Sequence, residues 1–174
     1  MNFLPIKLLK NSPTLLLLLI LSNSCSIKYS FTGASISPDI KTISVQYFSN
    51  YANLIQPTLS QTFTETLKDK FQSQTNLQLV NHIGDVNFEG EINRYFTQPV
   101  AIQGNETTAL NRLTITIRVK FTDSKEQENS FNTSFSRYAD YESSQILDQV
   151  EDELIEEIVE QIIDDIFNKA FVNW

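Results

Sequence analysis

The stretch Asn111–Phe121, NRLTITIRVKF, alternates strictly between apolar and polar side chains. Its apolar side chains are Leu113, Ile115, Ile117, Val119 and Phe121, and its polar ones are Arg112, Thr114, Thr116, Arg118 and Lys120. A period of two with β-branched residues predicts a strand that has one buried face and one solvent-exposed face. No other segment is an obvious cover for the polar face, which carries three cations.

Further strands are predicted on both sides of this one. The strand Lys41–Phe48 places Ile43, Val45 and Tyr47 on one face, and Leu77–Val80 is a short strand or an approach to one. The strand Ser130–Tyr138 follows a charged turn, so we expect it to pair antiparallel with Asn111–Phe121.

The segment Asp85–Phe96 is predicted to be a longer strand. Its inward residues are expected to be Val86, Phe88, Ile92 and Phe96, with Tyr95 facing out. Gly90 lies among the inward residues, and a glycine inside a strand indicates a bulge or a close backbone approach. The loop Thr97–Leu110 that follows is long for a hairpin, and such loops often carry function.

Two helices are expected. The first begins at Pro57 and ends near Gln74, and apolar residues recur in it every four positions, at Leu59, Phe63, Leu67 and Phe71. The second is capped by Ser143 or Ser144 and runs to about Phe171. Its many acidic residues are typical of a solvated helix face.

The apolar stripe of the second helix recurs about every four residues, from Ile146 to Phe171. An α-helix turns every 3.6 residues, so the stripe rotates by about 40° per repeat. A straight helix cannot bury both ends of such a stripe on a flat sheet. Either the helix wraps its own domain, or its last turns contact a partner.

These elements predict an α+β two-layer sandwich, in which two helices cover one face of a largely antiparallel sheet of four or five strands. The element order is β-α-(β)β-β-β-α. We expect residues 1–24 to be a lipoprotein signal peptide, 25–40 a lipidated tether, and 41–174 a single domain.

The signal-peptide prediction rests on Lys7 and Lys10, which precede the apolar run Thr14–Leu21. That run is too short for a membrane span of about 20 residues. Cys25, the single cysteine, follows it and resembles the lipidated residue of a bacterial lipobox. The usual leucine three positions before the cysteine is Ser22 here, so a plain signal peptide with an incidental cysteine is the alternative.

The charge balance argues against nucleic acid as a partner. The chain has 13 basic and 21 acidic residues, and removal of residues 1–24 takes away two lysines and no acids. We find no catalytic motif and expect no enzyme activity, cofactor or metal. His82 is the only histidine, and a metal site or a catalytic relay would need partners that it lacks nearby in sequence.

Together, the lipobox and four segments resemble the LPS-assembly lipoprotein family LptE, where LPS is lipopolysaccharide. The segments are FTGASISPDIKTISVQYF (Phe31–Phe48), PTLSQTFTETLKDKF (Pro57–Phe71), NRLTITIRVKF (Asn111–Phe121) and VEDELIEEIVEQIIDDIFNKAFVNW (Val150–Trp174). The resemblance implies a periplasm-facing lipoprotein of the outer membrane. It also implies a one-to-one complex with the LptD β-barrel, in which the lipoprotein is a plug, helps the barrel fold and assists LPS delivery.

The resemblance also directs attention to basic side chains near a strand-connecting loop as LPS contacts. Arg112, at the end of Thr97–Leu110, is the nearest candidate, followed by Arg118, Lys120 and Arg94. Arginine can bind phosphate oxygens bidentately. Ordinary surface cations are the alternative for these residues, and a lipid-anchored ligand-binding or secretion-accessory module without a barrel partner is the alternative for the protein.

Overall fold

A computed structural model of the chain describes residues 36–54, 56–100 and 109–172. All of them belong to the unit formed by residues 32–174. The predicted signal peptide, Cys25 and residues 101–108 of the long loop lie outside the described residues. Within the described part, no helix combines the length and apolarity that a membrane crossing requires.

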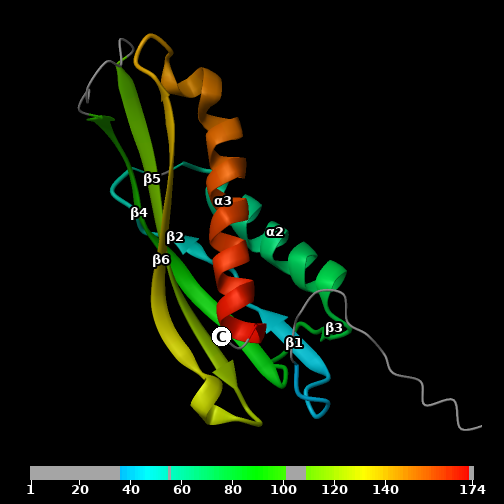
Figure 1. Cartoon of the computed structure of the whole chain (residues 1–174). Coiled ribbons are helices and arrows are strands. Elements are labelled where there is room, and N and C mark those ends of the chain that lie inside the picture. The colour runs from blue at the N-terminus through cyan, green and yellow to red at the C-terminus, as the bar shows by residue number, and fades with distance from the viewer. Residues whose placement is uncertain (1–35, 55, 101–108, 173–174) are drawn as a thin grey trace, which may run out of the picture. The chain divides into compact units, whose positions relative to one another are not determined.

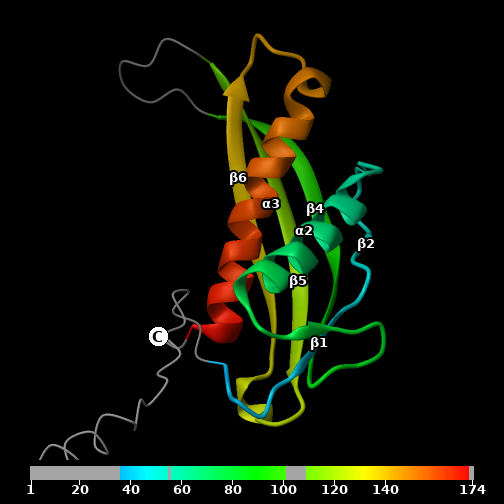
Figure 2. The same ribbon diagram turned by 90° about the vertical axis from the view of Figure 1, so that its right-hand side faces the viewer.

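The elements follow the predicted order. They are β1 (Thr42–Val45), β2 (Ser49–Asn50), α2 (Leu59–Gln74), β3 (Gln78–Leu79), β4 (Val86–Val100), β5 (Leu110–Asp123), the 3-10 helix η1 (Gln127–Asn129), β6 (Phe131–Glu142) and α3 (Leu147–Phe171). Both α-helices lie on the same side of the sheet (Figures 1 and 2). The α+β class with two helices on one face is therefore confirmed.

The sheet is mixed and has six strands, where four or five largely antiparallel ones were expected. Its order is β3-β1-β4-β5-β6, with β2 also paired to β4. The pairs β4–β5 and β5–β6 are antiparallel, whereas β1 is parallel to both β3 and β4. The parallel pairs follow from α2, because this crossover helix returns the chain so that β3 runs in the direction of β1.

The first predicted strand is interrupted. β1 ends at Val45, and pairing with β4 resumes at β2. In the interruption the Phe48 side chain turns into the core, and its backbone N–H donates to Thr64 Oγ1 of α2 at 3.2 Å. Tyr47 was predicted to share a face with Ile43 and Val45, which is wrong, since those two are buried and Tyr47 is 61% exposed.

A β-bulge at Asn93 changes which side chains of β4 face the core. The pairing with β5 shifts register between Ile92 and Arg94, so the alternation reverses beyond this point. Tyr95 is buried and Phe96 lies opposite Thr114 on the polar side. The expectation that Phe96 faces in and Tyr95 out is therefore wrong.

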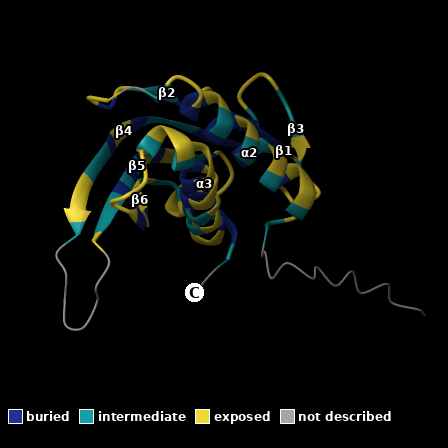
Figure 3. Ribbon diagram, turned by 90° about the horizontal axis from the view of Figure 1, so that it is seen from above, coloured by how far each residue is buried: buried dark blue, intermediate teal, exposed yellow. Residues whose placement is uncertain are grey.

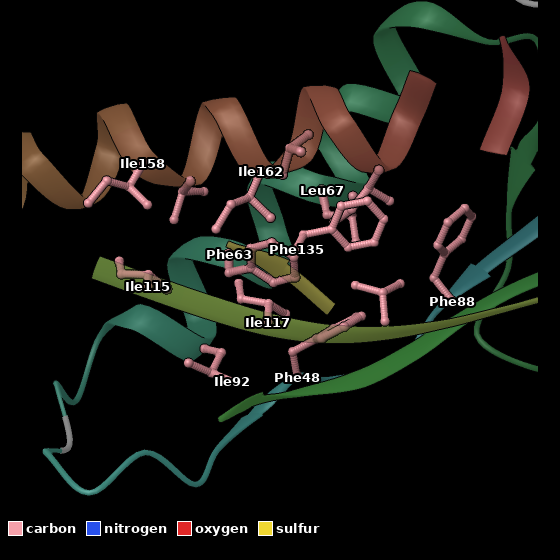
Figure 4. Close-up of a cluster of buried hydrophobic side chains, with 14 of the residues drawn as sticks. Phe48, Phe63, Leu67, Phe88, Ile92, Ile115, Ile117, Phe135, Ile158 and Ile162 are labelled. Atoms are coloured by element: carbon pink, nitrogen blue, oxygen red, sulfur yellow. The ribbon is translucent and has the colours of Figure 1, made fainter. Parts of the chain in front are cut away.

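Two helices and the sheet enclose the core. In Figure 4, Ile158 and Ile162 of α3 lie over Ile115 and Ile117 of β5, with Phe63 of α2 beside them. Seen from above, buried residues line the helix surfaces that face the sheet, and exposed residues line the opposite surfaces (Figure 3).

The drifting stripe of α3 is buried by the protein's own domain. The stripe is two residues wide, because both members of each apolar pair from Leu154/Ile155 to Ile166/Phe167 are buried. Ile158 points to the sheet, while Ile155 and Val159 border a groove between α3 and α2. At the start of the helix Ile146 is 63% exposed.

The predicted cap of α3 is wrong. The residue at the N-cap position is Ile146, which makes no side-chain capping bond. Ser144 Oγ instead donates to Glu142 Oε2 at 3.1 Å. Gln145 N–H donates to the Glu142 carbonyl in a turn. Because of this turn, the helix begins at Leu147, after both serines.

Candidate functional site on the open face of the sheet

The open face is the side of β4, β5 and β6 that faces away from α2 and α3. Across it, Glu89 lies opposite Lys120, Glu91 opposite Arg118, and Arg112 opposite Asp140. Other polar residues on this face are Asn87, Arg94, Gln98, Thr114, Thr116, Thr122, Asn132, Ser134 and Ser136, and two aromatic residues, Phe96 and Tyr138, lie among them. All four predicted site residues, Arg94, Arg112, Arg118 and Lys120, are therefore on one surface.

Within the described part of the chain, the turn that ends at Gly84 covers this side of the sheet at β1 and at the start of β4. There the Gly84 N–H donates to Ser44 Oγ at 3.1 Å, and Ser44 Oγ donates to Asn87 Oδ1 at 2.7 Å. Ser44 is 1% and Asn87 7% exposed. Over β5 and β6 the polar side chains remain half-buried or exposed. The hydrophilic surface predicted for Asn111–Phe121 is thus present and open.

Arg112 is held by two contacts. Its Nε and Nη2 donate to the two carboxylate oxygens of Asp140 at 2.7 and 2.8 Å, and its guanidinium carbon lies 3.6 Å from the centre of the Tyr138 ring. The hydrogen bonds raise the pKa of Arg112 above its usual value and lower the pKa of Asp140. Arg112 can therefore bind an external anion only in competition with Asp140.

Lys120 is also neutralised within the sheet. Its Nζ donates to Glu89 Oε1 on the neighbouring strand at 2.6 Å. Both side chains are exposed, at 55% and 42%, so this pair contributes at most about 1 kcal/mol to stability.

Arg118 differs from these two. It is exposed, and it makes no ion pair, hydrogen bond or ring contact with any other described residue. Glu91 is its partner in the strand register but does not form an ion pair with it. Arg118 borders a shallow depression of about 560 Å³ that is also lined by Gln46, Tyr47, Glu89, Glu91, Lys120 and Asn132. Its guanidinium is free to bind an oxyanion bidentately.

Arg94 reaches the open face because of the bulge at Asn93. Its guanidinium carbon lies 4.1 Å from the centre of the Phe96 ring. The aromatic contacts of Arg94 and Arg112 did not emerge from sequence reasoning. Alternation in β6 could have placed Tyr138 on this face, but the bulge concealed the position of Phe96.

The open face is almost balanced in charge. Its four cations lie among the carboxylates Glu89, Glu91 and Asp140. Among the described residues, no three His, Cys, Asp or Glu side chains gather as a metal site would require. The surface is therefore suited to polar contacts with another molecule, with Arg118 and Arg94 as its described cations that have no carboxylate partner.

A comparison with protein families adds to the fold and the polar surface. The family model LptE, described as lipopolysaccharide-assembly, matches residues 40–170 of the 174-residue chain. The chain belongs to the LptE family. The resemblance predicted from the sequence segments is confirmed. Family membership supports the role of an LPS-assembly lipoprotein in envelope biogenesis.

Two solved structures with low sequence identity share the fold of this LptE-family chain, and a third aligns with a lower score. A hypothetical protein from Chlamydia trachomatis aligns with a TM-score of 0.52 and 11% identity, covering 77% of this chain and 99% of that one. A protein from Xanthomonas campestris aligns with a TM-score of 0.51 and 12% identity, covering 80% and 90%. A minor lipoprotein from Acinetobacter baumannii has a TM-score of 0.49 and 14% identity, covering 75% and 91%. A search of curated proteins gives no match.

Membership of the LptE family implies an LptD partner and an interaction with LPS. The assignment of Arg94, Arg112, Arg118 and Lys120 as LPS contacts stays a prediction. The lipidation of Cys25 stays one too, since that residue lies outside the described part.

Proposed function

We propose that this LptE-family protein plugs the lumen of an LptD β-barrel in a one-to-one complex. In this role it helps the barrel assemble and assists the delivery of LPS to the outer leaflet. The observation that carries the proposal is the two-sided sheet, whose inner face is closed by α2 and α3 and whose outer face is polar and open. A wide barrel has a polar interior, which such a surface complements.

The contacts within the open face support packing against a polar lumen. The bidentate Arg112–Asp140 pair and the Thr116 Oγ1–Ser136 Oγ hydrogen bond, at 2.9 Å, satisfy polar atoms within the sheet. These atoms already have hydrogen-bond partners. When the barrel excludes water from them, they are therefore not buried without a hydrogen bond, which would be destabilising. Exposed groups such as Ser134 remain for contacts with the barrel.

Anchoring belongs to the same proposal. Residues 1–24 are removed on export, Cys25 receives the acyl chains, and residues up to 40 tether the domain on the periplasmic side of the outer membrane. Two or more acyl chains hold a protein at a bilayer far more firmly than one chain does. Palmitate labelling that disappears in Cys25→Ala tests this step, and unchanged labelling would contradict it.

The LPS contact is assigned to the cations of the open face. LPS is anionic, and Arg118 offers a guanidinium without an internal partner, next to Lys120. Arg112 and Arg94 lie nearer the loop end of the sheet and are held on Tyr138 and Phe96. In this proposal Arg118 makes the first contact, and Arg112 and Lys120 contribute when an LPS phosphate displaces Asp140 and Glu89.

Co-purification tests the barrel partner. The full chain is tagged, extracted from membranes in mild detergent and recovered, and the bound proteins are identified by mass spectrometry. We expect an outer-membrane β-barrel of the LptD type in an equimolar amount. Recovery of the lipoprotein alone from cells that contain LptD would favour the lipid-anchored module without a barrel partner.

A further inference from the structure

The outer edge of β6 pairs with no described strand. β6 is the last strand in the sheet order, and its other edge pairs with β5 through twelve successive residue pairs without a bulge. Among the described residues, the one backbone hydrogen bond of β6 outside the sheet is at its last residue, where the Glu142 carbonyl accepts from Gln145 N–H at 3.0 Å. Proteins usually protect long edge strands with charged residues, proline or bulges, and Phe131–Glu142 has no lysine, proline or bulge and only one inward-facing charge, Arg137.

Helix α3 follows this edge with a row of polar side chains spaced four residues apart, Glu153, Glu157, Gln161 and Asp165. At the lower end of the row, Arg137 of β6 donates to both carboxylate oxygens of Asp165 at 2.7 Å. Arg137 therefore neutralises Asp165 at this end of the row.

At the upper end the row lacks a cation. Neither Glu153 nor Glu157 forms an ion pair with any other described residue, and Glu157 accepts only the Gln161 side-chain amide at 3.1 Å. Both border a hollow of about 330 Å³ whose apolar part includes Tyr141, Val150 and Leu154. An arginine or lysine side chain could lay its aliphatic stem on these apolar groups and bring its charge to the glutamates.

We propose that the Arg137–Glu142 half of β6, together with Glu153 and Glu157, is a docking site for an extended cationic segment of another protein. The segment adds to the sheet as a strand, so its backbone pairs with the outer edge of β6. Alternate side chains face α3, and basic ones there pair with the two glutamates. The inference does not depend on the proposed function, because it requires neither LPS nor a barrel.

Charge selects this occupant over a second copy of the chain. Pairing two β6 edges would place the acidic row of one α3 near that of the other, together with Glu142 of each strand. Like charges at such distances oppose association. A cationic strand carries the opposite charge to these acidic groups, so it is attracted to the edge.

The test uses the full chain in detergent and two synthetic ten-residue peptides, one alternating arginine with valine and the other alternating glutamate with valine. Calorimetry measures binding, and hydrogen exchange measures protection of the β6 amides. We expect the arginine peptide to bind and to slow exchange between Arg137 and Glu142, and the glutamate peptide not to bind. E153Q/E157Q should weaken binding by about fivefold to tenfold.

E156Q/E160Q is the matched control, because it makes the same charge change on α3 but on the side that borders α2. It should alter binding by less than about twofold. Equal weakening in the two double variants, no binding of the arginine peptide, or protection outside β6 would overturn the proposal. Protection of the β6 amides in the absence of peptide would also overturn it in two cases. If this protection depends on protein concentration, a second copy occupies the edge, and if it depends on residues 26–35, the tether does.

Discussion

The ring of Phe48 lies against Gly90. A Cβ atom at position 90 would be 2.6 Å from Phe48 Cε1 and 2.0 Å from the backbone oxygen of Arg118. Position 90 therefore admits no side chain while β4, β5 and Phe48 keep their places. The close approach predicted for this glycine is confirmed, and the neighbours are a phenylalanine ring and the backbone of β5.

Gly90→Ala should lower the free energy of unfolding by about 3 kcal/mol, because backbone atoms of β5 must move to accept the methyl group. Urea denaturation measures the change. Ser134→Ala, on the open face, should stay within about 0.5 kcal/mol of the wild type. A Gly90→Ala protein as stable as the wild type would show that the two strands separate easily at this point.

Tyr95 joins β4 to α3, since its hydroxyl donates a hydrogen bond to Glu151 Oε1. Burial and the Glu151 carboxylate raise the pKa of Tyr95, so the hydroxyl stays protonated. Tyr95→Phe should cost about 1–2 kcal/mol of unfolding free energy. Phe96→Ser should cost less, because Phe96 faces the open side. The reverse ranking in chemical denaturation would contradict the register change at Asn93.

Asp85 fixes the start of β1. Its carboxylate accepts the backbone N–H groups of Lys41 and Thr42, both at 3.0 Å, and pairs with Lys125 at 3.1 Å. The hydrogen bond from Lys41, followed by those from Lys125 and Thr42, holds the pKa of Asp85 far below its usual value. Such a group stabilises the fold above its unfolded pKa of about 3.9, and the contribution is lost as pH falls toward the folded pKa.

Asp85→Asn should therefore be less stable than the wild type at pH 7, and the difference should shrink as pH falls below about 4. Thermal unfolding at pH 7 and at pH 3 measures both values. Glu128→Gln, in the exposed η1, is the control and should follow the wild type. A difference that grows on acidification would have the wrong sign for a depressed pKa.

The alternation in Asn111–Phe121 was sufficient to predict β5 and both of its faces. With strict alternation, only one orientation of the strand buries all the apolar residues. The burial pattern of β5 shows this orientation. The spacing in Pro57–Phe71 and in the last helix likewise predicted α2 and α3. Local periodicity determines these elements because each buries one continuous face.

The sequence could not reveal features that depend on pairing between distant segments. The bulge at Asn93 exists only in relation to β5, and it moves Arg94 and Phe96 to the open face. The parallel pairing of β1 likewise depends on where α2 returns the chain. For the site, the cations and their common face were predictable on β5, but the neutralising contacts of Asp140 and Glu89 required the strand register.

The pairing pattern makes a prediction about LPS binding. Arg118→Ala should weaken the binding of purified LPS by roughly tenfold, the loss expected for one charge-assisted hydrogen bond. Lys120→Ala should weaken it less, because Glu89 already neutralises Lys120. Glu89→Gln should strengthen binding by freeing Lys120. Equal affinities in all three variants, at matched stability, would remove this surface as the LPS contact.

Site-specific photocrosslinking in cells tests the central claim most directly. A photoreactive residue is placed on the open face, at Ser134 or Ser136, or on the helix side, at Glu65 or Glu156; all four positions are exposed. The account predicts that the open-face positions crosslink strongly to the LptD barrel and the helix positions weakly. Crosslinks to the barrel from Glu65 and Glu156 alone, with none from Ser134 and Ser136, would contradict it.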